Sequence, residues 1–291
     1  MDAQQASDGG GKEFRRVADE LRTRMVNGTY PLQSYLPAQR VLAEEFGVSR
    51  DTVQRVLREL VAEGWVAPKQ GSGTRVIKTQ QIQPTEPKMT GLRRGATLGD
   101  IISQAFEQPE VTLDVYTLTS ESLDTHIRLQ AERIHAGIIA PQRIRLRLLL
   151  PDDAQPLPYP RAKHDADDLR PLERLRAITR RHTASLRGTL KDLQTVKLVP
   201  SVDVQIRRAQ LTPAFKLYLL NGTEVLYGMY EVVERPIELD TGEVIDSLDV
   251  LGLGATLIHY VKDVDPDSPG AVFVDRAEVW FESVWEHLGR E

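Results

Sequence analysis

The sequence contains no cysteine, which excludes a disulfide framework and thiolate metal sites and is compatible with a reducing compartment. No apolar run approaches the roughly 20 residues that a membrane-spanning helix needs. The six histidines show no His-x-x-x-His spacing of the kind that binds metal ions. From these absences we expect a cytoplasmic protein without a metal ion or a cofactor, and with no membrane partner.

The N-terminus also lacks the features of a targeting segment. Residues 1–11 are polar and rich in glycine, with neither a basic region nor an apolar stretch. Such a segment is not a signal peptide and cannot bury enough apolar surface to fold alone. We therefore expect residues 1–11 to form a disordered tail.

The net charge of −5 conceals an asymmetry along the chain. From Lys12 to Lys78 there are twelve Lys and Arg against eight Asp and Glu, a net of +4. From Thr79 to the end there are 25 against 32, a net of −7. A mildly basic head on an acidic body predicts that only the head contacts a polyanion.

The most informative stretch is 41–73. A short helix ends at Gly47, and a second helix starts at once with Ser49 as its N-cap. The second helix carries an apolar stripe at i, i+3, i+4, i+7 and i+8, and a polar, basic opposite face. The stripe is Val53, Val56, Leu57, Leu60 and Val61, and the polar face is Arg50, Thr52, Gln54, Arg55 and Arg58. Two helices joined so tightly predict a helix-turn-helix, although an ordinary helical hairpin with a solvated face is the alternative.

The flanking segments favour the helix-turn-helix. Residues 13–27 read as a helix, and residues 38–46 as the next, with Val41, Leu42 and Phe46 facing inward. After the second of the tightly joined helices, residues 65–68 and 74–77 read as two short strands around a glycine-containing turn. A helix-turn-helix followed by a β-hairpin is a winged helix.

Four motifs in 14–76 resemble the DNA-binding domain of the GntR family of bacterial transcription regulators. They are Leu36-Pro37-x-x-Arg40-x-Leu42-Ala43, Gly47-Val48-Ser49-Arg50-x-Thr52-Val53, Leu57-x-x-Leu60-x-x-Glu63-Gly64 and Gln70-Gly71-Ser72-Gly73-Thr74. The resemblance implies that Arg40 and Arg50 reach guanines in the major groove, as a guanidinium fork can. It implies that Ser49, Thr52 and the wing tip touch phosphate.

The full set of expected DNA contacts is Arg40, Ser49, Arg50, Thr52, Gln54, Arg55, Lys69, Gln70 and Gly71. A salt bridge from Arg40 to Glu44 at i+4 is the alternative role for that arginine. The sequence departs from the family pattern at Ala38, Gln39, Gln54 and Arg55. Ala38 removes a helix cap worth about 1 kcal/mol, and Gln54 could read adenine or touch phosphate.

Beyond a proline-broken linker at 79–97, residues 98–291 read as a mixed α/β domain. Residues 111–150 read as a strand, a helix from Ser120 and a second strand, a β-α-β unit with parallel strands. Asn221-Gly222 marks a hairpin. The remaining expected elements are helices at 97–107, 172–193 and 275–288, strands at 202–209, 215–220 and 224–235, and helix or strand at 257–261.

The order of elements, the Asn221-Gly222 hairpin and the closing helix with Phe281-x-x-x-Trp285 resemble a phospholipase-D-like half-domain, which some regulators use as a sensor after it has lost its chemistry. That reaction needs a His-x-Lys pair, and no histidine here is followed by lysine two residues on, the nearest being His259 with Lys262. Residues 163–168 could hold a cation or be a solvated loop. An anionic effector could bind four arginines of one helix, whose other reading is a solvated face: Arg176, Arg180, Arg181 and Arg187.

The sequence therefore predicts an α+β or α/β two-domain protein with a winged helix-turn-helix at 12–78 and a ligand-binding or dimerisation domain at 98–291. The expected function is a dimeric repressor that binds a palindromic double-stranded DNA operator and answers to an unidentified small-molecule effector. The rivals are a phosphodiesterase-type enzyme with a DNA-tethering head and a DNA-binding protein without sequence preference.

Overall fold

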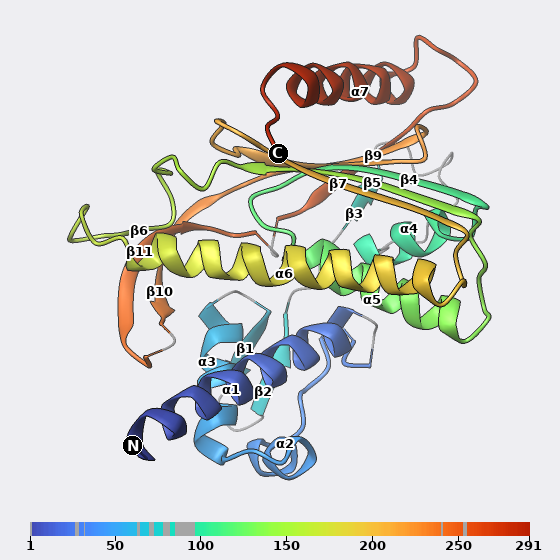
Figure 1. The fold of residues 1–291 in the computed structure, drawn as a ribbon. Helices are drawn as coiled ribbons and strands as arrows, with labels where there is room; N and C mark the ends of the chain where they lie inside the picture. The colour runs from blue at the N-terminus through green and yellow to red at the C-terminus, as the bar shows by residue number, and fades with distance from the viewer. Residues whose placement is uncertain are drawn as a thin grey trace. The chain divides into compact units, whose positions relative to one another are not determined.

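The computed structural model describes residues 2–26, 29–31, 33–62, 65–69, 73–77, 82–84, 97–239, 241–252 and 255–291. The chain forms two compact units, each built from several segments (Figure 1). Unit 1 comprises residues 1–80, 159–174 and 232–254, and unit 2 comprises residues 81–158, 175–231 and 255–291.

Unit 1 contains three helices and two small sheets. The helices are α1 (Asp2–Val26), α2 (Gln39–Phe46) and α3 (Arg50–Ala62), and the first sheet pairs β1 (Val66–Lys69) with β2 (Gly73–Val76) in antiparallel register. One apolar cluster joins them, with Leu21, Leu42, Leu60 and Trp65 among its buried members. The predicted helix-turn-helix and hairpin are therefore confirmed as elements around a common core.

Three expectations about this unit were wrong in detail. Helix α1 starts at Asp2, so the segment expected as a disordered tail is helical. Val41 and Val61, expected to face inward, are 43% and 39% exposed. The turns of α2 and α3 that carry them bury neighbouring side chains instead, among them Leu42 and Leu60.

The second sheet of unit 1 comes from much later in the chain. It has the order β10-β11-β6, formed by β10 (Val232–Glu238), β11 (Val244–Val250) and β6 (Arg161–Ala162), all antiparallel. We expected one strand over 224–235 and did not foresee β11. The chain instead leaves one sheet at Met229 and enters another at Val232.

Unit 2 is a seven-stranded sheet of order β3-β12-β9-β8-β4-β5-β7. Its strands are β3 (Ile82–Pro84), β4 (Glu110–Tyr116), β5 (Arg143–Pro151), β7 (Ser201–Ala209), β8 (Phe215–Leu220), β9 (Glu224–Met229) and β12 (Leu257–Val261). Strands β4, β5 and β7 are parallel, whereas β8 runs antiparallel to β4. The edge strand β3 lies inside the segment 79–97 that we expected to be a linker.

Helices cover both faces of this sheet. In Figure 1, α5 (Glu121–His135) and α6 (Arg170–Thr195) lie along one face and α7 (Pro269–His287) along the other. The short helix α4 (Leu98–Ala105) packs with α5 in the first of these layers. The two layers have separate apolar cores, one around Leu146 and Tyr218, the other around Tyr116 and Trp285.

The expected mixed α/β architecture of the C-terminal part is thus confirmed, and so are several of its local signals. Asn221 and Gly222 both have positive φ (51° and 66°) in the turn between β8 and β9. The open choice at 257–261 resolves to a strand. Helix α7 begins at Pro269, six residues earlier than expected, because the hydroxyl of Ser268 caps it by accepting the N–H of Ala271 at 3.1 Å.

Candidate nucleic-acid interface

The turn between α2 and α3 is built from local backbone chemistry. Gly47 ends α2 with φ 65°, a left-handed conformation that favours glycine. Two residues later, the hydroxyl of Ser49 accepts the N–H of Thr52 at 3.1 Å and caps α3, as the sequence predicts. Ala38 makes no side-chain cap at the start of α2. The geometry therefore fixes how the two helices meet and leaves the first turn of α2 less firmly held.

The outer face of α3 presents a row of polar side chains. Arg50, Gln54 and Arg58 are exposed at a spacing of four residues, which places them on one side of the helix. The opposite side is buried through Val53, Val56 and Leu60. Arg58 was not among the expected contacts, although its i+4 spacing from Gln54 could have identified it. Helix α3 therefore offers two guanidinium groups and an amide to a ligand in front of it.

Arg40 lies on the exposed side of α2. Its side chain is 69% exposed, and its Nε lies 3.9 Å from a carboxylate oxygen of Glu44. A surface pair of that length contributes about 0–1 kcal/mol and leaves the guanidinium free to move. The ion pair with Glu44 therefore exists, but it does not immobilise the side chain of Arg40. The geometry is compatible with both the salt bridge and a contact of Arg40 with DNA.

Two other expected contacts are engaged within unit 1. Thr52 is 7% exposed, and its hydroxyl lies 2.9 Å from that of Ser49. Arg55 donates from Nε to Glu238 of β10 at 2.6 Å and lies over the ring of Phe14, 5.2 Å from its centroid. A DNA contact by either Thr52 or Arg55 requires these interactions to be exchanged for contacts with phosphate or base.

The wing is anchored to the loop before α2. Arg75 forms a bridge with Tyr35, and its Nε donates to the carbonyl of Gln33 at 3.1 Å. At the other strand, Lys69 pairs with Gly73 and is exposed at the end of the hairpin. The expected contacts Gln70 and Gly71 lie outside the described residues. The described part of the wing thus places one cation, Lys69, beside the hairpin tip.

The loop considered as a cation site uses its acidic groups internally. Arg170 binds the carboxylate of Asp168 through two nitrogens, at 2.9 and 2.7 Å, and holds the pKa of that carboxyl below its usual value. Asp165 accepts the N–H of Asp167 at 3.0 Å. These contacts favour the reading as a solvated loop.

Among the helices that the structure describes, none has the length and apolarity to cross a membrane.

Comparison with known proteins assigns the head. Residues 14–76 match the family described as bacterial regulatory proteins, gntR family, so this segment is a GntR-family helix-turn-helix domain. The chain is 40% identical over 67 residues to the HTH-type transcriptional regulator GmuR of Bacillus subtilis, covering 23% of this chain and 28% of that protein. It is 41% identical over 69 residues to the mannosyl-D-glycerate transport/metabolism system repressor MngR of Escherichia coli, covering 24% and 29%.

The matched stretches thus span less than a third of these two curated relatives. A solved Streptococcus agalactiae GntR structure shares 24% identity over 43% of this chain and 63% of its own, with a TM-score of 0.22, which carries no argument about the fold. The comparisons therefore identify the type of the DNA-binding head and assign no function to unit 2. The resemblance to a phospholipase-D-like half-domain stays a prediction.

Proposed function

We propose that this chain is a sequence-specific DNA-binding transcriptional repressor whose C-terminal α/β part binds a small effector. The observation that carries the proposal is the exposed row of Arg50, Gln54 and Arg58 on a helix whose other side is buried in a GntR-type head. The major groove of B-DNA admits a helix, and guanidinium groups read guanine O6 and N7 bidentately. Relatives that match the head include a named repressor, which supports the sign of the regulation.

The proposed division of labour follows the side-chain geometry. Arg50 and Arg40 read bases, since both are exposed and retain their freedom to orient. Ser49, Thr52 and the wing with Lys69 hold the phosphate backbone, which sets register and carries no sequence information directly. Gln54 and Arg55 change which bases the helix recognises. The DNA sequence of the half-site should therefore differ from that of relatives that carry other residues at these two positions.

The test of the proposal is fluorescence anisotropy of the full chain with DNA from upstream of its own gene, against shuffled DNA of equal composition, at two salt concentrations. A specific regulator binds the native sequence at least about a thousandfold more tightly than the shuffled one. Equal binding to both, with a steep dependence on salt, is the result expected of a binder without sequence preference and contradicts the proposal.

Arg50→Ala is expected to weaken binding to the specific site by roughly 1–3 kcal/mol and to relax discrimination at one base pair. The physical reason is the loss of a bidentate donor that phosphate contacts cannot replace. Arg187→Ala, which removes an exposed arginine from α6 in unit 2, is the control of equal charge change. Unchanged affinity in Arg50→Ala would remove this residue from the base-reading set.

The proposed regulator binds as a homodimer to a palindrome. Its half-sites then lie about one helical turn, or roughly 10–10.5 base pairs, apart or at a multiple of that spacing. Inserting about five base pairs between them rotates one half-site to the opposite side of the duplex, so the dimer reaches only one half. We expect the affinity for the expanded operator to fall to that of a single half-site, and insertion of a full turn to restore part of it. Equal affinity for all three spacings would contradict a rigid dimer.

A further inference from the structure

One edge of the seven-stranded sheet of unit 2 is open. The strand order places β7 at this edge, with β5 as its one neighbour among the described strands. The N–H of Ser201 and the carbonyl of Ala209 form hydrogen bonds with residues that flank β5. Successive residues of a strand direct these backbone groups to alternate sides. The N–H and carbonyl groups of Val202, Val204 and Ile206 therefore point away from β5, and no described strand pairs with them.

The open part of this edge is bounded at both ends. On the C-terminal side the next outward-facing residue is Arg208, whose N–H and carbonyl exchange hydrogen bonds with Arg290 at 2.7 and 2.8 Å. On the N-terminal side the corresponding position is Pro200, which has no N–H to donate. The open edge therefore covers 202–206 and is centred on Val204.

The two edges of the sheet differ in a way that bears on pairing. The opposite edge strand, β3, has three residues and ends at Pro84. Short edge strands and proline are two means by which proteins prevent sheets from pairing edge to edge. Strand β7 has nine residues and no proline. Just before it, Val196 and Leu198 are 49% and 37% exposed, so apolar surface accompanies the open edge.

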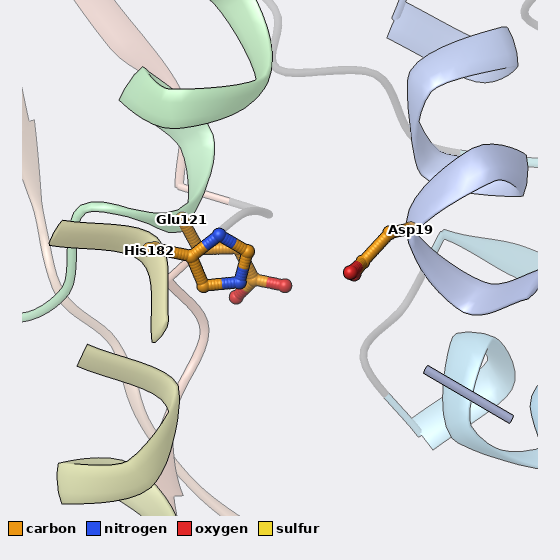
Figure 2. A group of neighbouring side chains, drawn as sticks. All are labelled: Asp19, Glu121 and His182. Carbon is orange, nitrogen blue, oxygen red and sulfur yellow. The ribbon is translucent and has the colours of Figure 1, made fainter. Parts of the chain in front are cut away.

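The layer behind β7 holds this strand in place. The partly buried valine and isoleucine side chains of β7 pack against the apolar core to which α5 and α6 contribute. A buried pair joins these two helices, with Nδ1 of His182 2.8 Å from a carboxylate oxygen of Asp124. Figure 2 shows the ring of His182 beside Glu121, in the first turn of α5. An edge that is already formed loses little conformational freedom when another strand pairs with it.

We propose that β7 pairs with β7 of a second copy of this chain, antiparallel and about a two-fold axis at Val204, so that two sheets join into one. A contact in which the same surface serves both copies closes at two, which is the stoichiometry that a palindromic operator needs. This interface belongs to the homodimer of the proposed function and rests on that proposal.

The residues of β7 fit this register. Val202 lies opposite Ile206 of the second copy, and Val204 lies opposite its own counterpart. Each such pair exchanges both backbone hydrogen bonds, and pairs of β-branched side chains stabilise a sheet. On the other face Asp203 meets Gln205 of the second copy, so no like charges are directly opposite. Within one strand these two side chains already pair, since Nε2 of Gln205 donates to Asp203 at 2.9 Å.

The test uses the absence of cysteine from the chain. The full chain with Val204→Cys is oxidised with diamide and run on a non-reducing gel. Opposite residues of a hydrogen-bonded antiparallel pair have Cα atoms about 5.5 Å apart, a separation that a disulfide can bridge. We therefore expect a covalent dimer that a reductant dissolves.

Two other single-cysteine variants are the controls for this experiment. Gln205→Cys tests a register shifted by one residue, which would place Val202 opposite the occupied Arg208. Val264→Cys, at a position 101% exposed in unit 2, reports random collision. Both should remain uncrosslinked under the conditions that link Val204→Cys. Preferential linking of Gln205→Cys, or equal linking of all three variants, would overturn the proposal.

Multi-angle light scattering of the full chain gives a second measurement. Val204→Pro removes an outward-facing N–H and no hydrogen bond to β5, and proline is tolerated on edge strands in this orientation. Wild type is expected to be a dimer, and Val204→Pro to dimerise at least about tenfold more weakly. Val204→Thr keeps the N–H and the β-branched shape and should remain a dimer.

The outcomes of these experiments separate the interface from the function. A monomeric wild type would leave the edge to a strand of another protein and would overturn the proposal, as would a dimeric Val204→Pro. If circular dichroism shows that Val204→Pro does not fold, the cross-linking of Val204→Cys decides. Specific operator binding by a chain that does not link at Val204 rejects only this interface. Linking at Val204 without preference for the native DNA rejects only the proposed function.

Discussion

Replacing Glu59 by alanine should lower the free energy of unfolding of unit 1 by about 1–3 kcal/mol. Glu59 is 4% exposed on α3 and pairs with Arg174 at the start of α6. Its carboxylate oxygen also lies 4.0 Å from a guanidinium nitrogen of Arg22 on α1, a side chain 6% exposed. Removing the acid leaves Arg174, whose side chain is 18% exposed, without its carboxylate, whereas Arg22 keeps its ion pair with Asp19 at 3.0 Å. The cost is therefore that of one hydrogen-bonded charge that loses its partner in a poorly solvated region.

The measurement is hydrogen exchange of the α1 and α3 amides in the full chain, because three tryptophans in two units blur a fluorescence signal. Glu243→Ala is the control. Glu243 is 53% exposed and pairs with Arg170 at 2.7 Å, so its loss should cost about 0–1 kcal/mol. A similar small effect for Glu59→Ala would show that water solvates Arg174 once the acid is gone, and that this ion pair does not hold unit 1 together.

The head could be predicted from sequence because its signals are local. A glycine at the end of α2, a serine cap two residues later and an apolar stripe on α3 all act within one or two helical turns. Periodicity failed at Val61, where an apolar residue continues the spacing of the stripe but projects outward beyond the core. A stripe defines a direction on the helix and does not show where the neighbouring element ends.

The hairpin β10–β11 could not be foreseen as part of unit 1. Its contacts with α3 include the hydrogen bond between Arg55 and Glu238, which are 183 residues apart in sequence. Nothing in the sequence around Arg55 or Glu238 indicates that the two side chains form a pair. The strand-like residue pattern of 224–238 also runs without interruption from β9 into β10, which belong to different sheets. Arg55 was consequently expected only as a DNA contact, whereas the structure also gives it an acidic partner.

Lys216 was missed for a different reason. Alternation along a strand indicates burial only when one face of the sheet is solvated. Strand β8 is internal, with β4 and β9 as neighbours, and helices cover both faces of the sheet, so all its positions from Lys216 to Leu220 are buried. A lysine within such a strand indicates a buried charge with contacts inside the protein, and the Nζ atom of Lys216 lies 5.8 Å from the centroid of the Tyr230 ring.

Acid should destabilise unit 2 through His126, which is 2% exposed on α5. Burial lowers the pKa of His126 from 6.5 to about 4; Asp100 opposes this lowering, and the positive charge of Lys216 adds to it. The unfolded chain therefore binds a proton near pH 6.5, whereas the folded chain binds it only near pH 4. Between these values the unfolded state holds more protons, so stability falls as the pH falls, by about 3 kcal/mol in total at 1.36 kcal/mol per pKa unit.

The measurement is urea unfolding of the full chain in phosphate-free buffers between pH 7 and 4. Unfolding of unit 2 is monitored by hydrogen exchange of the β5 amides in its core. His126→Gln should remove about 3 kcal/mol of the pH dependence, because its amide does not titrate. His135→Gln, an exposed histidine on the same helix, is the matched control and should behave as wild type. Carboxylates also titrate in this range, so the quantity to compare is the pH dependence of the unfolding free energy in His126→Gln and in His135→Gln. The same pH dependence in His126→Gln and wild type would show that the ring of His126 gains a proton without unfolding, by local opening between α4 and α5.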